Sequence, residues 1–212
     1  MVRRTKEEAL ATRHQILDAA ERVFHEKGVS RTSLHEIAEA AGVTRGAIYW
    51  HFEDKADVFN AMLKRVTLPL EETARRNGDP ELADPVAFMR KNFTDALRKT
   101  VNDPQVRRVF EIAVHKVEYV EELRAVRERR LQLRNECMSH VERGLKLAMR
   151  RGQLARRMPA KVAALGLHVL IDGLIQNWML DPEAFDLVRA GRQVLDTYLA
   201  GLAVAPVRKP AR

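Results

Sequence analysis

Side chains suited to contacts with DNA gather near the N-terminus, between residues 44 and 55. An arginine such as Arg45 can donate two parallel hydrogen bonds to a guanine edge in the major groove. Hydroxyl, imidazole and ammonium groups are suited to phosphates, which position a protein without reading the base sequence. Gly46 has no side chain, so a helix that carries it can approach the bases closely. The predicted DNA contacts are Thr32, Ser33, Thr44, Arg45, Gly46, Tyr49, His51 and Lys55.

Two short helices joined by a tight turn would position these side chains. Ser33 and Glu36 have the S-x-x-E spacing of a capping box, which predicts that a helix starts there. Gly42 can adopt the positive φ of a turn that ends this helix, and Thr44 can cap the next one. An earlier helix that ends at Gly28 would pack across the pair, so the pattern predicts a tri-helical helix-turn-helix. The residues expected to fill its core are Ala38, Val43 and Ile48.

The run from Thr32 to Phe52, followed by Lys55, resembles the TetR family of repressors. It is most similar to the multidrug-efflux subgroup, typified by AcrR-like repressors, through the string G-V-T-R-G-A-I-Y-W-H-F at residues 42–52. The similarity is dense over residues 3–65 and continues beyond them in fragments. The resemblance implies a ligand-responsive repressor that is released from its operator when a small molecule binds. The later fragments include Arg107-Arg108, Glu111-Ile112, His115-Lys116-x-Glu118, Arg151-Gly152 and Asp172-Gly173.

The rest of the chain also indicates helices, because no segment has the alternating pattern of a strand. We expect an all-α fold with an N-terminal three-helix helix-turn-helix head and a C-terminal helical body for ligand binding and dimerisation. The predicted domains are a DNA-binding domain at 1–54, an effector-binding and dimerisation domain at 55–204, and a disordered tail at 205–212. The helices expected in the body lie at 86–101, 105–117, 120–151, 160–180 and 183–202.

Four amphipathic faces in the body could close on a core or on a cavity. On one of them His168, Asp172 and Gln176 interrupt apolar residues at helical spacing, and buried polar groups need partners. Drug-like molecules are held in mostly apolar pockets with a few polar anchors. The predicted effector pocket comprises Met89, Phe93, Phe110, Val114, Cys137, Val141, His168, Asp172 and Gln176. Phe110 and Val114 make this wall more apolar than a broad drug sensor needs, so a fatty acid or other metabolite remains an alternative to a hydrophobic drug.

The last two helices carry more apolar residues than one monomer obviously needs. Two such helices from each of two protomers would form a four-helix bundle about a two-fold axis. A homodimer would present two reading helices, so we expect a palindromic double-stranded operator. The residues expected at this interface are Ile171, Leu174, Ile175, Trp178, Phe185, Val188, Val194, Leu195, Tyr198 and Leu199.

Composition places limits on these predictions. The net charge is +8, but residues 1–60 carry 9 Lys+Arg against 10 Asp+Glu, so the case for DNA depends on positions. The lone Cys137 fits a reducing cytoplasm, although a redox role stays open, and the apolar stretch at 163–180 is too interrupted by polar residues for a membrane span. We predict no enzyme, cofactor or metal, because no nucleophile–base pair, phosphate loop or ligand cluster occurs. A DNA-organising protein without an effector remains an alternative.

Overall fold

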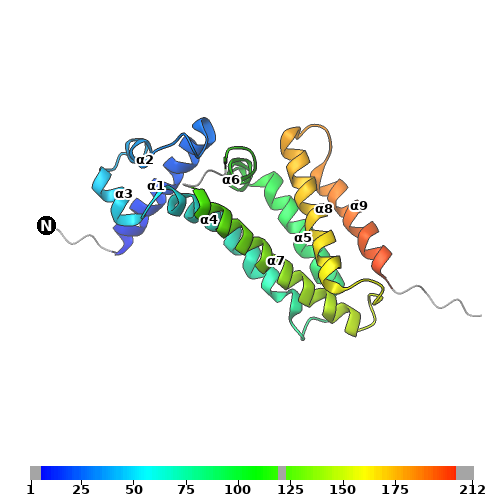
Figure 1. The fold of residues 1–212 in the computed structure, drawn as a ribbon. Coiled ribbons are helices and arrows are strands. Elements are labelled where there is room, and N and C mark those ends of the chain that lie inside the picture. The colour runs from blue at the N-terminus through cyan, green and yellow to red at the C-terminus, as the bar shows by residue number, and fades with distance from the viewer. Residues whose placement is uncertain (1–5, 119–122, 204–212) are drawn as a thin grey trace, which may run out of the picture. The chain divides into compact units, whose positions relative to one another are not determined.

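The computed structural model describes residues 6–118 and 123–203, and every regular element within them is helical (Figure 1). The all-α prediction is therefore confirmed, while the tail expected at 205–212 lies outside the described residues. The longer helices expected in the body are present with ends that differ by a few residues. The elements are α1 (Lys6–Lys27), α2 (Leu34–Ala40), α3 (Arg45–His51), α4 (Lys55–Arg75), the 3₁₀ helix η1 (Arg76–Gly78), α5 (Pro85–Asn102), α6 (Pro104–His115), α7 (Arg124–Arg150), α8 (Ala160–Leu180) and α9 (Leu187–Leu202).

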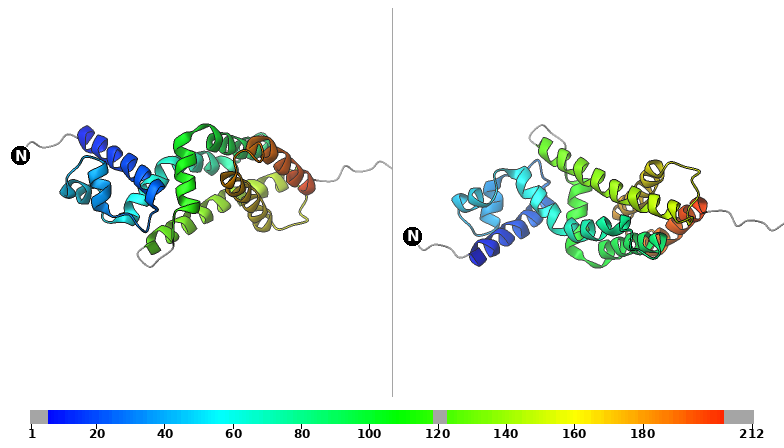
Figure 2. Two further views of the ribbon diagram at one scale, coloured as in Figure 1. Left: turned by 90° about the horizontal axis from the view of Figure 1, so that it is seen from above. Right: turned by 90° about the horizontal axis from the view of Figure 1, so that it is seen from below.

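The chain forms two compact units, each made of two separate segments. The first unit comprises Met1–Leu68 and Asp103–Gln132, and the second comprises Pro69–Asn102 and Leu133–Arg212. Of the three boundaries, one therefore falls inside α4, one falls between α5 and α6, and one falls inside α7, which Figure 2 shows as one uninterrupted helix. This division differs from the domain boundary expected after residue 54, since it joins the start of α4 and all of α6 to the N-terminal helices.

A proline marks the first of these boundaries. Pro69 lies inside α4, at the first residue that belongs to the second unit. A proline has no amide hydrogen, so the helical hydrogen bond to the carbonyl of Arg65 cannot form. The helix continues to Arg75 and lacks one backbone hydrogen bond where it passes from one unit to the other.

The core of the first unit closes α1, α2 and α3 into the expected three-helix arrangement. Phe24, Ile37 and Phe59 are almost wholly buried, and the rings of Phe24 and Phe59 are 6.1 Å apart. Ala38 and Ile48 are buried as expected, whereas Val43 is only half-buried. The apolar faces of α1, α2, α3 and the start of α4 thus share one small core, which fixes the direction of α3.

The second unit packs α5, α8 and α9 side by side and closes around apolar residues of all three. Met89 of α5, Leu167 of α8 and Leu195 of α9 belong to one buried cluster, and Trp178 is buried with Leu97 in another. Three residues expected at a dimer interface, Trp178, Leu195 and Leu199, are therefore buried within their own chain. That part of the interface prediction is wrong, because these apolar side chains of α8 and α9 pack against residues of α5 in the same chain.

Among the described residues, α8 alone is long and apolar enough to cross a membrane by length and composition. Its Ala163, Ala164 and Leu167 pack into the core of the second unit. The tyrosine hydroxyl of Tyr198 on α9 donates a hydrogen bond to the carbonyl of Ala163 at 3.0 Å. One face of α8 therefore packs against its neighbours in the second unit.

Gly144 lets α7 approach η1 and α5 closely, and we expect Gly144→Ala to lower the melting temperature. A Cβ added there would lie 2.8 Å from the carbonyl oxygen of Asn77 and 3.0 Å from the sulfur of Met89. Overpacking against backbone costs about 1–3 kcal/mol, which corresponds to a decrease of roughly 2–10 °C for a chain of this size. Gly201→Ala is the matched control, because a Cβ at Gly201 meets nothing within 4 Å. Equal melting temperatures for the two variants in a thermal unfolding experiment would contradict the close contact.

Candidate nucleic-acid interface and effector site

The start of α2 is fixed by the predicted capping box. The hydroxyl of Ser33 accepts a hydrogen bond from the amide of Glu36 at 3.2 Å, and the carboxylate of Glu36 accepts one from the amide of Ser33 at 2.8 Å. The ammonium of Lys27 donates to the same carboxylate at 2.6 Å. These bonds, first that from Lys27 and then those from Ser33, lower the pKa of Glu36 to about 2. The carboxylate is therefore ionised at neutral pH and holds α2 to the end of α1.

The turn between α2 and α3 also follows the prediction. Gly42 has φ +62°, in the region that favours glycine. The amide of Val43 donates to the carbonyl of Ala38 at 3.0 Å, which closes the end of α2. Thr44 then caps α3, because its hydroxyl accepts a hydrogen bond from the amide of Ala47 at 3.2 Å. Local signals of the sequence therefore determine where the reading helix α3 begins.

Two polar side chains of α1 hold the end of α2, and the sequence patterns did not reveal them. Gln15 donates to the carbonyl of Ala41 at 2.6 Å, and Arg22 donates to the carbonyl of Ala40 at 3.2 Å. The last carbonyls of a helix have no partner within the helix, so such side chains satisfy them. The contacts join residues 18 and 26 positions apart. Helical periodicity contains no signal for pairs this distant.

The outward face of α3 is open and carries the side chains expected to meet DNA. Thr44, Arg45 and Gly46 are exposed, and Tyr49 is 50% exposed. The guanidinium of Arg45 lies 5.7 Å from the centre of the Tyr49 ring. An aromatic ring beneath an arginine restricts the directions that the guanidinium can take. This face can therefore present a partly oriented arginine to a groove.

Trp50 belongs to this surface, although the sequence left its role open between core packing and DNA contact. It is 72% exposed and meets the ring of His51 edge-on at 4.5 Å. An indole this exposed contributes little to the core. It lies immediately after Tyr49 on the exposed end of α3 and enlarges the aromatic part of the surface.

Two of the expected phosphate contacts lie inside the first unit. Thr32 is 2% exposed, and its hydroxyl donates to the carbonyl of Gly28 at 2.8 Å. Lys55 is 7% exposed, and its ammonium donates to the carbonyl of Ser30 at 3.0 Å. Both side chains tie the loop after α1 to its surroundings. The surface set that remains for a DNA contact is Ser33, Thr44, Arg45, Gly46, Tyr49 and the half-buried His51.

Known proteins and family models are similar to this chain over almost its whole length. Residues 16–62 match the model of bacterial regulatory proteins of the tetR family, and residues 84–204 match the C-terminal region of the MAATS-type transcriptional repressors. The transcriptional regulator TtgR of Pseudomonas putida is 41% identical over 206 residues, which cover 97% of this chain and 98% of TtgR. The chain belongs to the TetR family.

Two solved structures support this membership. NalD, the secondary repressor of the MexAB-OprM multidrug efflux pump in Pseudomonas aeruginosa, has a TM-score of 0.83 at 38% identity and covers 93% of this chain and 98% of NalD. SmeT, the repressor of the Stenotrophomonas maltophilia multidrug efflux pump SmeDEF, has in its complex with triclosan a TM-score of 0.86 at 35% identity, over 95% of this chain and 96% of SmeT. This TetR-family chain is thus a transcriptional regulator built like the efflux-pump repressors.

The residues expected to line the effector pocket fall into three groups in this TetR-family fold. Met89 and Val141 are fully buried in the core of the second unit, with Phe93 and Cys137 packed against them. Phe110 and Val114 lie half-buried on α6 of the first unit. The polar members His168, Asp172 and Gln176 lie one turn apart on α8. Met89 and Val141 are thus core residues, and the half-buried ones are the better candidates for ligand contact.

The polar members of the set partly satisfy one another. The amide of Gln176 donates to the carboxylate of Asp172, which is exposed. Burial lowers the pKa of His168, and the charge of Arg134 lowers it further, while Asp172 opposes both. His168 is therefore mainly neutral at pH 7 and can both donate and accept a hydrogen bond.

Cys137 has the environment of a structural cysteine. Burial raises the pKa of its thiol, and the nearby charge of Glu71 raises it further. A thiol that stays protonated is a poor nucleophile and oxidises slowly. This environment favours a packing role for Cys137 over the redox role that the sequence left open. Within the described part of the chain, no group of three His, Cys, Asp or Glu side chains could hold a metal ion.

Proposed function

We propose that this protein is a cytoplasmic, homodimeric repressor that binds a palindromic operator and controls the operon of a multidrug efflux pump. The observation that carries the proposal is the exposed, capped helix α3 in a chain that matches efflux-pump repressors over nearly its full length. Arg45 reads a guanine edge in the major groove. Ser33, Thr44, Tyr49 and His51 contact phosphates and set the register.

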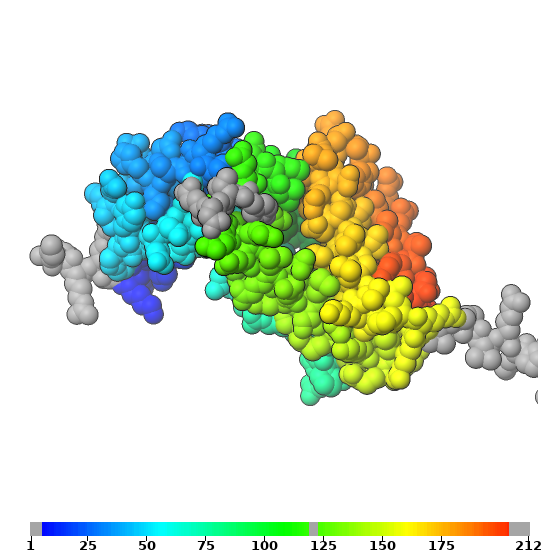
Figure 3. Space-filling model, viewed as in Figure 1, coloured from blue at the N-terminus to red at the C-terminus, as the bar shows by residue number. Residues whose placement is uncertain are grey.

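A second copy of this chain is the proposed partner of α8. Val162, Leu165 and Val169 are about half exposed and follow one another at spacings of three and four residues, so they form one apolar stripe. Figure 3 shows α8, in yellow to orange, on the surface of the second unit. An apolar stripe that pairs with its own copy about a two-fold axis forms the isologous interface that is usual for dimers. The dimer then presents two α3 helices to the two half-sites.

The effector is a hydrophobic small molecule that acts by shifting populations. It binds better to the arrangement of the dimer in which the two reading helices do not fit the operator spacing. Half-buried His168 supplies a polar anchor and half-buried Phe93 supplies apolar contact, while Gln176 and the exposed Asp172 continue the face of α8 that carries Leu165 and Val169. Helices α4 and α7 both belong to the two units, and α4 lacks one helical hydrogen bond at Pro69, so we take α4 as the lever between effector site and reading helix. A coupling of about 1–3 kcal/mol weakens operator binding about ten- to a hundredfold.

The test begins by selecting the preferred sequence from a pool of random duplex DNA with the purified protein. Binding of the selected duplex is then followed by fluorescence anisotropy at 100 mM salt, with and without triclosan. We expect a palindromic selected sequence and weaker binding when triclosan is present. Specific binding that neither triclosan nor a panel of hydrophobic antimicrobials weakens would overturn the drug response and leave a metabolite sensor or a DNA-organising protein. No sequence preference at all would overturn the whole proposal.

A further inference from the structure

One carboxylate in the first unit is buried and surrounded by cations, and it takes no part in the proposed contacts with DNA or effector. Glu21 lies in the C-terminal half of α1 and is 3% exposed. A buried carboxylate is unfavourable unless hydrogen bonds and opposite charges compensate for its lost hydration. Its partners therefore indicate what the residue does.

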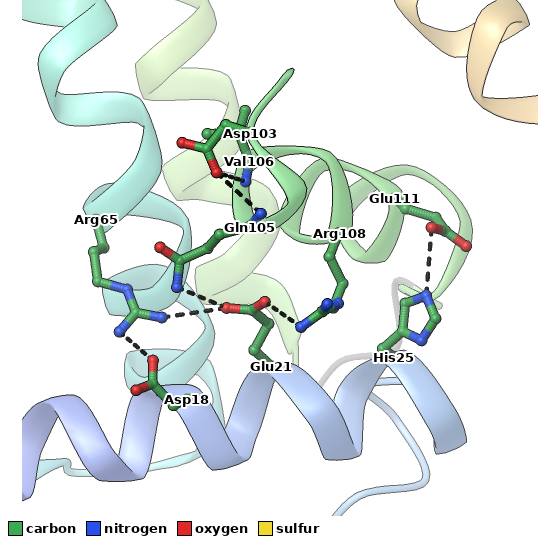
Figure 4. Close-up of polar contacts among 9 residues, drawn as sticks. All are labelled: Asp18, Glu21, His25, Arg65, Asp103, Gln105, Val106, Arg108 and Glu111. Carbon is green, nitrogen blue, oxygen red and sulfur yellow. Dashed lines mark hydrogen bonds and ion pairs between the residues drawn. The ribbon is translucent and has the colours of Figure 1, made fainter. Parts of the chain in front are cut away.

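Glu21 accepts hydrogen bonds from two other helices (Figure 4). Arg65 of α4 donates to one carboxylate oxygen at 3.2 Å, and Gln105 of α6 donates to the same oxygen at 3.0 Å. Arg108 of α6 donates to the other oxygen at 3.0 Å. Arg65 also donates to Asp18, one turn earlier on α1, at 2.7 Å. The carboxylate of Glu21 thus joins three helices that are distant in sequence, and all of them belong to the first unit.

Further polar contacts of α6, and of the residues just after it, lead to α1 or to the loop after α1, while the carbonyl of Ala113 accepts a hydrogen bond from Arg130 of α7 at 2.7 Å. Glu111 lies 3.3 Å from the imidazole of His25 (Figure 4). Beyond the end of the helix, the carbonyl of Lys116 accepts a hydrogen bond from the amide of Val29 at 2.9 Å. Glu118 accepts one from the hydroxyl of Ser30 at 3.1 Å. Helix α6 is therefore attached along its length to the helix that supports α2.

These contacts explain a group of residues that the sequence comparison noted without assigning a role. The fragments Arg107-Arg108, Glu111-Ile112 and His115-Lys116-x-Glu118 supply the contacts to α1 and the loop after it. The same α1 holds the end of α2 through Gln15 and Arg22. A path of direct contacts therefore runs from α6 through α1 to the helices that read DNA.

We propose that Glu21 is a positioning residue of the DNA-binding unit. The charged hydrogen bonds of its carboxylate hold α6 and α4 against α1. They thereby fix the direction in which α3 is presented. If glutamine replaces it, the shape remains, but Arg108 loses this anion, Arg65 keeps only the carboxylate of Asp18, and Gln105 loses a charged acceptor. Hydrogen bonds to charged groups are stronger than those to neutral ones. Helix α6 then separates from α1 and opens locally more often, while the core of the second unit is unaffected.

The first experiment measures backbone hydrogen–deuterium exchange of the full chain by mass spectrometry. In Glu21→Gln, we expect peptides from residues 104–115 to exchange about ten- to a hundredfold faster than in the unaltered protein. Peptides from α8 and α9 should be unchanged. Glu26→Gln is the matched control, because Glu26 is an exposed glutamate five residues later on α1. Arg108→Gln removes the same contact from the half-exposed side and should give the same local pattern, more weakly.

Two results of this experiment would overturn the proposal. The first is equal exchange at residues 104–115 in Glu21→Gln and Glu26→Gln. The second is uniformly faster exchange throughout the chain in both Glu21→Gln and Arg108→Gln, which would make the cluster a source of general stability only. The double variant adds a further criterion: its effect on α6 should be smaller than the sum of the single effects, because both substitutions remove one shared contact.

The second experiment concerns positioning, and it rests on the proposed function. The duplex selected by the unaltered protein is compared with duplexes whose half-sites are one base pair closer or farther apart. A protein with loosely held reading helices tolerates wrong spacing, so we expect Glu21→Gln to reduce the preference for the natural spacing about tenfold. An unchanged preference would overturn the positioning role. If the unaltered protein selects no duplex, the proposed function fails, while the exchange experiment still decides whether Glu21 seats α6.

Discussion

Operator affinity is expected to fall about a hundred- to ten-thousandfold when Leu165 and Val169 are both replaced by aspartate. The two residues are 47% and 58% exposed on one face of α8, so the monomer can accept the change with little loss of stability. Two charges on each copy of the stripe would prevent it from pairing with itself. A monomer holds a single half-site and loses the gain in effective concentration that a linked second reading helix supplies. Light scattering after size-exclusion chromatography gives the oligomeric state, and anisotropy gives the affinity.

The control for this experiment is Leu131→Asp, which places the same charge on a leucine of α7 that is 40% exposed. It should remain a dimer and keep its operator affinity within a few-fold. A double variant that still migrates as a dimer would show that the protomers meet through another surface. A monomer that binds the operator as tightly as the unaltered protein would show that one reading helix is sufficient.

Arg45→Ala is expected to lose about 1–3 kcal/mol of binding free energy at each half-site, which is on the order of ten- to a hundredfold in affinity per half-site. Arg45→Lys separates the two contributions of the side chain. Lysine keeps the charge but cannot make the planar, bidentate contact. The lysine variant should therefore keep the salt dependence of binding and lose the preference for one base pair in each half-site. The measurement is anisotropy on the selected duplex and on single-base-pair variants, at several salt concentrations.

The result for Arg45→Lys decides how α3 reads DNA. An unchanged preference at every base pair would mean that Arg45 contacts phosphate only. Specificity would then have to come from the aromatic side chains Tyr49 and Trp50 or from the shape of the DNA. The aromatic contact between Arg45 and Tyr49 suggests a companion measurement. Tyr49→Leu should weaken the same base preference, because it removes the surface that orients the guanidinium.

The parts of the fold that the sequence predicted depend on local chemistry. Ser33 with Glu36, Gly42 and Thr44 determine helix ends through contacts that span at most four or five residues. The apolar periodicity likewise gave the helices of the second unit, because it reports which face of a helix is buried. A single chain therefore contains enough information to place α2, the turn and α3.

The side chains that the sequence misplaced depend on long-range packing. Lys55 has the residue type of a phosphate contact, but the fold places its ammonium against the carbonyl of Ser30. Trp178 and Leu195 lie at helical spacings typical of a dimer interface, but contacts among α5, α8 and α9 bury them within the chain. Glu21 meets Gln105 and Arg108 across 84 and 87 residues. Charged residues on α1 and α6 look like ordinary surface charges until the two helices are placed together.

The division of the first unit into two segments has a consequence for how such regulators diversify. The DNA-binding unit is encoded in two pieces, residues 1–68 and 103–132, with part of the other unit between them. A single recombination event near residue 54 would therefore join Glu21 from one parent to Arg108 from the other. A hybrid protein keeps a matched α1–α6 contact only if residues 103–132 come from the same parent as residues 1–68, or if both parents have the same residues at positions 21 and 108. New operator specificities should thus arise by substitutions on α3 more readily than by exchange of the N-terminal segment alone.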